Sequence, residues 1–332
     1  MRKGGTPSEA LWETVKLAQA AESFGYTRYW VAEHHNSGSY TGTSPEVLIG
    51  QIAANTRAIR VGSGGVMLTH YSAFKVAEQF RILETFFPGR IDLGIGRAPG
   101  SDQLAAAALA HPRPQSDINQ FPQQITDLLG FLAGTLNSDH PFAKLRAQPG
   151  PPPDSIPEVW LLGSTDYSAR LAASLGLPFA FAEFFGNPED RGVAAAELYR
   201  KEFKPSRFLA EPKVNVAVQV MCAPTEEEAQ FIASGRNLGK GASVLGLSER
   251  QGMLSPEEAS AYPLTEEARK YLQRITRGFI DGDPQQVRER ILKVAERYST
   301  TDIGIVTNCY YFEHRVRSYQ LIAEAFGLTG SA

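Results

Sequence analysis

The chain has 332 residues, enough for one large α/β domain or two ordinary ones. Hydrophobic residues make up 42% of the chain and charged residues 21%, which excludes a disordered or fibrous protein. The formal net charge is −3 and no basic block stands out, which excludes an electrostatic footprint for nucleic acid.

Short apolar runs bounded by glycine alternate with amphipathic segments, a pattern that is typical of parallel βα units. The chain opens with a helix that begins at the capping sequence Thr6-Pro7-Ser8-Glu9 and ends at Gly25. Most of the apolar runs are continuous, as in strands that are buried on both faces. The expected strands are Tyr29–His34, Ile59–Leu68, Ile91–Gly96, Val159–Gly163, Phe179–Ala182, Val214–Cys222 and Ile303–Thr307.

Seven strands suit an open doubly wound sheet, whereas a (β/α)8 barrel needs eight, so the strand count favours neither fold. The expected helices between and after the strands are Pro45–Thr56, Ala73–Phe87, Phe121–Leu132, Ser168–Leu175, Pro188–Phe203, Glu226–Ser234, Pro284–Tyr298 and about Glu313 to Phe326.

Three segments interrupt this alternation. Residues 98–120 and 146–157 are predicted to be long loops on either side of the Phe121–Leu132 helix. Residues 235–283 are predicted to be an insertion with helical pieces. Long segments of this kind often form lids or the walls of binding sites.

The first group with chemical potential is Glu33-His34-His35, at the carboxyl end of the first expected strand, where parallel α/β folds place their sites. Adjacent strand residues point to opposite faces, so the two histidines do not share one metal ion easily. Glu33 and His35 could, with His70 as the only further candidate ligand. We prefer an interpretation in which one histidine is catalytic and the other residues support it.

The run Val61–Leu68 contains three glycines, which weaken a strand unless something requires them. A flat ligand against bare backbone and a β-bulge are equally good explanations. The run Gly89–Asp102 has glycines in the spacing G-x-G-x-x-x-G, which does not match the dinucleotide-binding fingerprint.

Arg97 ends the next expected strand, where a permanently charged side chain suits a phosphate or a carboxylate. The alternative is an ion pair with Asp92 or Asp102. At residues 162–169 a strand ends in Gly163-Ser164 and a helix begins at once, which makes either an anion site or an ordinary helix cap. Arg97 adds weight to the anion site.

Taken together and in this order, these segments resemble the bacterial luciferase-like flavin monooxygenase family, and most of all its single-chain luciferase-like oxidoreductases. The similarity extends from about Gly5 to Gly327. The matching pieces are YWVAEHHN (29–36), VGSGGVML (61–68), FPGRIDLGIGRAPGSD (87–102), LLGSTDYSARLAASLGLPFAFA (161–182) and RVRSYQLIAEAFG (315–327).

The resemblance implies a (β/α)8 TIM barrel, and we expect a single domain over residues 1–332 with 235–283 as a lid region. Family members begin with a strand before the equivalent of Gly4-Gly5, and no such strand is visible here. We therefore expect the first strand to be missing from this chain and the barrel to be open at one seam.

Within the resemblance, His34 matches the family's catalytic histidine. Gly64 and Gly65 match a pair that is joined by a non-prolyl cis peptide bond beneath the flavin ring. Gly96 stands where luciferase has a cysteine near the reactive flavin carbon, which argues against light emission and leaves oxygen chemistry open.

The same resemblance assigns a phosphate site. Arg97 matches the phosphate-binding arginine. The residues that match the phosphate loop are Gly163, Ser164, Tyr167 and Ser168.

The resemblance implies a monooxygenase that uses O2 and reduced FMN, supplied by a separate flavin reductase, on a small organic substrate. An F420-dependent hydride transferase on the same barrel is the first alternative. A non-catalytic flavin-binding protein and a metal-dependent hydrolase built on Glu33 and His35 are the others.

Neither Cys222 nor Cys309 has a CxxC partner, so we expect no disulfide framework and no structural metal site. No apolar stretch reaches membrane-spanning length, and no signal-like apolar region follows the N-terminus, so we expect a cytoplasmic protein. A homodimer is expected by analogy with the family.

Overall fold

The computed structural model describes residues 1–112, 117–150, 155–186, 191–247 and 252–330. Within these ranges, eight parallel strands form one sheet in the order β1 to β7, and β8 pairs with β6. The strands are β1 (Arg28–Val31), β2 (Arg60–Met67), β3 (Ile91–Gly96), β4 (Glu158–Gly163), β5 (Phe179–Ala182), β6 (Val214–Cys222), β7 (Ile280–Gly282) and β8 (Asp302–Val306).

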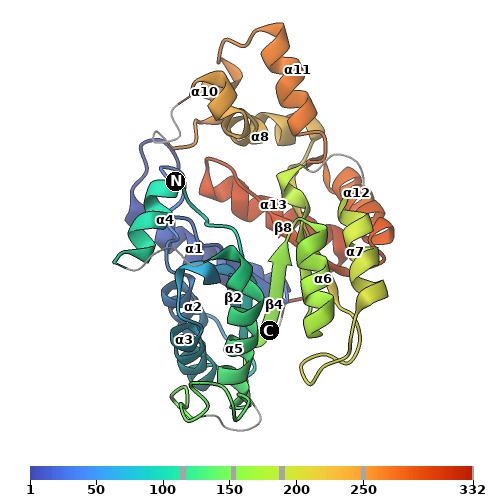
Figure 1. The fold of residues 1–332 in the computed structure, drawn as a ribbon. Coiled ribbons are helices and arrows are strands. Elements are labelled where there is room, and N and C mark those ends of the chain that lie inside the picture. Colours follow the sequence, from blue (N-terminus) through green and yellow to red (C-terminus); the bar gives the residue numbers. More distant parts are fainter. Residues whose placement is uncertain (113–116, 151–154, 187–190, 248–251, 331–332) are drawn as a thin grey trace.

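Helices surround this sheet. Figure 1 shows α2, α3 and α5 on one side of the strands, α6, α7 and α12 on the other, and α8, α10 and α11 above them. The helices are α1 (Pro7–Ser23), α2 (Pro45–Ala54), α3 (Ala73–Phe86), α4 (Gln103–Ala110), α5 (Phe121–Ala133), α6 (Asp166–Leu175), α7 (Arg191–Glu202), α8 (Glu226–Lys240), α9 (Ala242–Leu245), α10 (Pro256–Ser260), α11 (Glu266–Ile275), α12 (Pro284–Arg297) and α13 (Phe312–Phe326), with 3-10 turns η1 (Leu68–His70), η2 (Ile118–Gln120) and η3 (Glu183–Phe185). Among these described helices, none combines the length and apolar character needed to span a bilayer.

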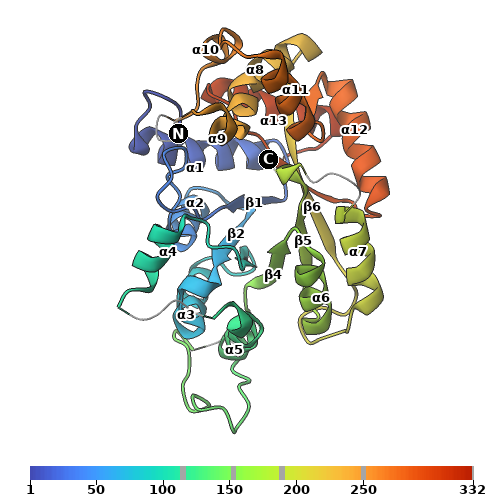
Figure 2. The same cartoon turned by 45° about the horizontal axis from the view of Figure 1, so that its top comes forward.

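The strands curve into a barrel that hydrogen bonds do not close (Figure 2). In the described chain β1 pairs with β2 alone and β8 with β6 alone, so a seam separates β8 from β1. Side chains cross the seam: Arg28 forms an ion pair with Asp302 at 2.8 Å, and the Tyr26 hydroxyl donates to the carbonyl of Tyr319. The expected open barrel is confirmed.

A buried charge ties the amino ends of the strands together. The Asp92 side chain is fully buried and accepts hydrogen bonds from Trp30 Nε1 at 2.8 Å and from Arg60 Nε at 2.9 Å. Burial raises the pKa of Asp92, and these two donors oppose that effect. Arg28 Nε lies 3.4 Å from the same carboxylate, so three neighbouring segments depend on one side chain.

Three segments differ from the sequence prediction. The first strand ends at Val31 rather than His34, which places the histidines in a loop. The predicted loop 98–120 contains α4, whose four consecutive alanines favour a helix without an apolar periodicity. The segment 235–283 holds the end of α8, three more helices and β7, an eighth strand of three residues that is too short to predict.

The bounds of the remaining predicted helices agree with the structure to within a few residues. The start of one predicted helix cannot be compared. The predicted Pro188–Phe203 helix corresponds to α7, and residues 187–190 lie outside the described residues. The capping box at Thr6 and Glu9 is formed as predicted.

We predict that Asp92→Ala lowers the free energy of unfolding by about 3 kcal/mol, because Trp30 and Arg60 lose their buried hydrogen-bond acceptor. Urea unfolding of the full chain measures the change. Arg170→Ala, which removes a surface ion pair to Glu202, is the control and should change the stability by less than about 1 kcal/mol. Equal effects of the two substitutions would contradict the structural role of Asp92.

Candidate active site

The four segments singled out in the sequence follow β1, β2, β3 and β4, or form their last residues. These strands are neighbours and parallel, so their carboxyl ends lie at one edge. That edge carries the active site in barrels of this architecture. The structure therefore brings the predicted segments together.

Glu33 is the centre of a buried hydrogen-bond network at this edge. Glu33 is buried, with only 1% of the residue exposed. One carboxylate oxygen accepts from the Tyr71 hydroxyl at 2.8 Å and lies 2.7 Å from His35 Nε2, and the other accepts from the backbone N–H of Met67 at 2.9 Å. The network fastens the loop after β1 to the end of β2.

The Tyr71 hydroxyl can only donate in this arrangement. Burial and the hydrogen bond to Glu33 both raise the pKa of Tyr71, so the phenol stays protonated at neutral pH. Sequence analysis missed Tyr71, because it lies 38 residues from Glu33 and no spacing rule connects them.

His34 lies between Glu33 and His35 in the chain. Its ring stacks on Tyr40 with 4.6 Å between the ring centroids, and its backbone N–H donates to the carbonyl of Gly42 at 2.8 Å. Burial lowers the pKa of His34, while the charge of Glu33 acts in the opposite direction. The imidazole is therefore neutral at pH 7, a state that can accept a proton.

The glycines of β2 lie at an irregularity of the strand, as the β-bulge explanation requires. The Gly64-Gly65 peptide bond is cis, and the register of β2 against β3 shifts between Gly64 and Val66. A Cβ on Gly65 would lie 2.8 Å from the carbonyl oxygen of Gly94, so the neighbouring backbone alone requires glycine there. A Cβ on Gly64 would meet Trp30 at 3.3 Å.

Gly96 ends β3 beside Met67, and a Cβ on Gly96 would lie 3.0 Å from the methyl carbon of Met67. A larger side chain would therefore push on Met67, whose backbone N–H is held by Glu33.

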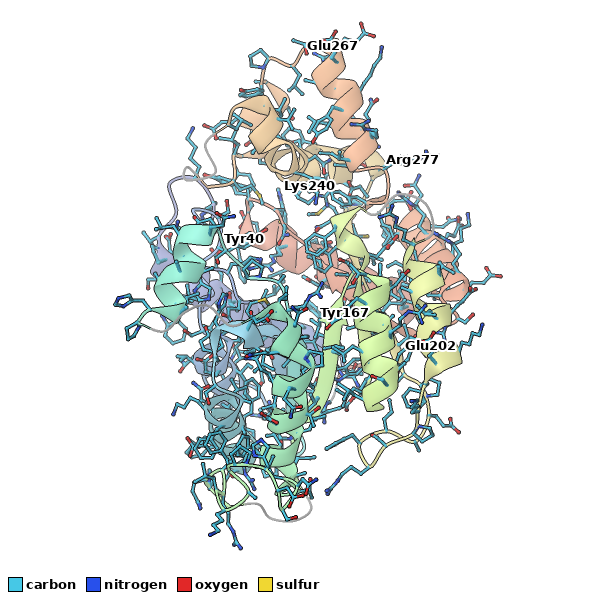
Figure 3. The ribbon with its side chains drawn as sticks, viewed as in Figure 1. Tyr40, Tyr167, Glu202, Lys240, Glu267 and Arg277 are labelled. Carbon is cyan, nitrogen blue, oxygen red and sulfur yellow. The ribbon has the colours of Figure 1, made fainter. Side chains whose placement is uncertain are left out.

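Arg97 follows β3, and Tyr167 lies in the first turn of α6, which follows β4. The two side chains are in contact. The Arg97 guanidinium lies over the Tyr167 ring, 4.2 Å from its centroid. Among the described residues no carboxylate lies within 4.0 Å of Arg97, so the alternative of an ion pair with Asp92 or Asp102 is not found. Figure 3 shows Tyr167 below the α8–α11 part of the chain, on which Lys240 and Glu267 lie.

The first turn of α6 completes this region. Thr165 caps the helix through the backbone N–H of Ser168, and the Ser168 hydroxyl donates to the carbonyl of Thr165 at 2.9 Å. A Cβ on Gly163 would lie 2.0 Å from the Ser168 hydroxyl oxygen, so the chain needs glycine there. Ser164 lies between the last residue of β4 and the cap.

The described residues contain no group of three His, Cys, Asp or Glu side chains that could hold a metal ion. Glu33 and His35, the pair proposed for a metal-dependent hydrolase, bond to one another instead. Their hydrogen bond favours the interpretation in which they support the site.

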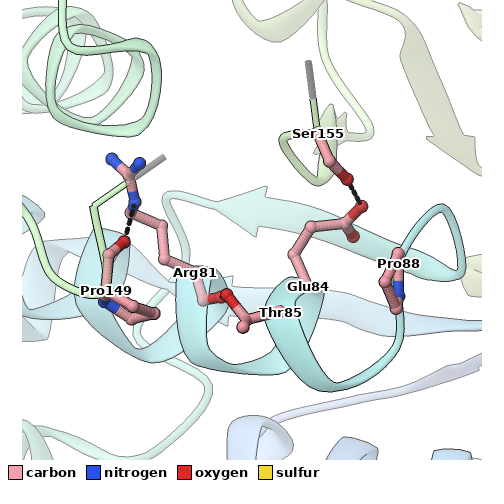
Figure 4. A pocket seen from close by; sticks show the side chains of 6 residues that line it. All are labelled: Arg81, Glu84, Thr85, Pro88, Pro149 and Ser155. Atoms are coloured by element: carbon pink, nitrogen blue, oxygen red, sulfur yellow. Dashed lines mark hydrogen bonds between the residues drawn. The ribbon is translucent and has the colours of Figure 1, made fainter. Parts of the chain in front are cut away.

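Two hollows lie at the opposite, amino ends of the strands. One has a volume of about 90 Å³ and lies beside the end of α3 (Figure 4), where Arg81 Nε donates to the carbonyl of Pro149 and Glu84 accepts from Ser155. The other, of about 680 Å³, lies beside the starts of β6 and β8. Neither is part of the edge described above.

More distant solved structures share the fold. The FMN complex of the oxygenating constituent of 3,6-diketocamphane monooxygenase from Pseudomonas putida is 20% identical, with a TM-score of 0.69 over 98% of this chain and 95% of that one. An F420-dependent secondary alcohol dehydrogenase in complex with an F420-acetone adduct is 14% identical, with a TM-score of 0.67 over 97% and 96%.

Nearer relatives cover almost all of the chain. YwcH of Bacillus subtilis (strain 168) is 43% identical over 98% of this chain and 96% of its own length. The N-acetyl-S-alkylcysteine monooxygenase of the same organism is 39% identical over 97% and 94%. The crystal structure of apo-MsnO8 is 35% identical, with a TM-score of 0.89 over 99% and 96%. The luciferase-like monooxygenase family itself matches residues 2–301, and this chain belongs to that family.

Proposed function

We propose that this chain is a flavin-dependent monooxygenase that binds reduced FMN, supplied by a separate reductase, and uses O2 on a small organic substrate. The observation that carries the proposal is the Arg97 guanidinium, which has no carboxylate partner among the described residues and stands over Tyr167 at the start of α6. Reduced FMN would supply the electrons for oxygen activation.

The residues at this place fit the phosphate group of FMN. A guanidinium and the N-terminal turn of a helix of ten residues both favour a dianion. Arg97 and the backbone N–H groups after Ser164 would hold the phosphate, with the hydroxyls of Ser164 and Ser168 beside it. Tyr167 would keep the guanidinium in place through their stacking.

His34 would hold or move a proton at a ring nitrogen that faces the bound substrate. Its low pKa keeps the imidazole neutral, and the Glu33 network fixes the loop that carries it. Gly64, Gly65 and Gly96 would give the flavin ring a flat backbone surface. The 235–283 region, which holds the end of α8 together with α9, α10 and α11, would exclude water from above the strands.

The substrate is proposed at the level of its reactive group. One relative is named for an N-acetyl-S-alkylcysteine, so a thioether of that kind is the first substrate to test. F420 is the alternative cofactor, and a homodimer in the cytoplasm remains the expected form of the protein.

We predict that the full chain binds reduced FMN saturably under anaerobic conditions, and that Arg97→Ala weakens this binding by about 10- to 100-fold. Anaerobic titration followed by flavin absorbance measures both affinities. Arg57→Ala, at an exposed position that follows α2, is the matched control and should leave the affinity unchanged. A folded wild-type protein that binds F420 and not FMN would contradict the FMN assignment.

We predict that Glu33→Gln shifts the acidic limb of the kcat/KM profile to lower pH. The charge of Glu33 raises the pKa of His34, so its loss lowers that pKa, and the neutral imidazole persists in more acidic solution. Initial rates of NADH-coupled turnover between pH 5 and about 8 measure the limb. Tyr71→Phe removes a hydrogen bond without changing the charge and should leave the limb in place. A limb that moves upward, or moves equally in both variants, would show that His34 is not the titrating group.

A further inference from the structure

The loop that carries Arg97, residues 97–102, is fixed at both ends. It begins where β3 ends at Gly96, and it ends at Asp102, which caps α4 by accepting from the backbone N–H of Ala105 at 2.8 Å. Arg97 directly follows the strand. The place of its guanidinium therefore depends on the course of this short segment, here called the Arg97 loop.

Two hydrogen bonds hold the backbone of the Arg97 loop against the segments that follow β1 and β2. The backbone N–H of His35 donates to the carbonyl of Gly100 at 2.9 Å. His70 Nε2 lies 2.7 Å from the carbonyl oxygen of Pro99 and donates to it, because a carbonyl oxygen can only accept. The Arg97 loop and the loop that carries His34 are therefore joined to one another.

Close packing adds to this attachment. Gly100 has φ +59°, and a Cβ at this position would lie 2.8 Å from the carbonyl oxygen of Glu33 and 3.0 Å from Met67 Cγ. Glycine is therefore required here, both by the positive φ and by the neighbouring backbone. The Arg97 loop passes directly over the residue that anchors the His34 loop.

One bond between side chains completes the connection. Asn36 Nδ2 donates to Asp102 Oδ2 at 2.6 Å. Asn36 has φ +52°, a left-handed conformation that asparagine, aspartate and glycine adopt more readily than other residues. Both residues are exposed, so the bond contributes little to global stability and its removal leaves the protein folded.

The geometry of phosphate binding makes such a connection important. A guanidinium binds a phosphate through N–H donors in a fixed planar arrangement, so a small displacement of the loop weakens the contact. A loop that samples several conformations before binding must also be ordered when the ligand binds, at a cost in affinity. The Arg97 guanidinium is in place over Tyr167 without a ligand.

We propose that Asn36 and Asp102 are positioning residues that hold the Arg97 guanidinium where it meets the flavin phosphate, and that they act through the Arg97 loop. The inference rests on the proposed function, because it names two further residues of the same site. The effect of losing their hydrogen bond therefore passes through Arg97 and the phosphate, and leaves the binding of the flavin ring unchanged.

The test compares reduced FMN with reduced riboflavin, which lacks the phosphate, by anaerobic titration of the full chain. Asn36→Gly removes the hydrogen bond without a change of charge and suits the positive φ. We expect it to weaken FMN binding by about 5- to 10-fold and riboflavin binding by less than about twofold. In the Arg97→Ala background it should change FMN affinity by less than about twofold, because the residue through which it acts is gone.

Exchange of the two side chains is the rescue. Asn36→Asp alone places two carboxylates against each other and should weaken FMN binding at least as much as Asn36→Gly. Asn36→Asp/Asp102→Asn restores a donor and an acceptor, keeps the net charge and leaves a residue that caps α4. FMN affinity should then return to within about twofold of the wild-type value.

Asn55→Gly is the matched control. It removes an exposed asparagine at the end of α2, whose side chain donates to Gln51, and should leave both flavin affinities unchanged. Circular dichroism of each variant verifies the fold.

Equal losses of FMN and riboflavin affinity in Asn36→Gly, an exchange that restores nothing, or an undiminished effect in the Arg97→Ala background would overturn the proposal. A wild-type protein that prefers FMN, with the same preference in Asn36→Gly, loses the positioning role alone. A wild-type protein that binds neither flavin, or binds both equally, contradicts the phosphate role of Arg97 and with it the proposed function.

Discussion

The buried carboxylate of Glu33 is the interaction on which the candidate site depends. It joins the loop after β1, the end of β2 and Tyr71 through three hydrogen bonds, and its charge acts on His34. A buried carboxylate is stable only when its oxygens are satisfied, and here three donors do so. The anchorage holds the loop that carries His34 against the end of β2.

The carboxyl edge of the barrel places a cationic region and a histidine-bearing loop together. Arg97 and Tyr167 stand at the start of α6, which suits a phosphate. His34 belongs to the loop that follows β1, at the same edge.

The sequence predicted the elements that local residue patterns determine. Capping residues and continuous apolar runs located most helices and seven of the strands, and the resemblance identified the family and the open barrel. The sequence did not predict α4, because the alanines of this helix have no apolar periodicity. It did not predict β7 either, because three residues form no recognisable apolar run. Tyr71 and the Arg236–Asp281 pair were also missed, since contacts between residues 38 and 45 positions apart depend on the fold.

The central claim is that the Arg97 region holds the phosphate of a flavin. A crystal structure of the full chain grown with FMN tests it most directly. We predict the FMN phosphate within hydrogen-bond distance of the Arg97 guanidinium and of the first turn of α6, with the ring against Gly64-Gly65. A phosphate bound elsewhere, while Arg97 stays stacked on Tyr167 without a partner, would contradict it.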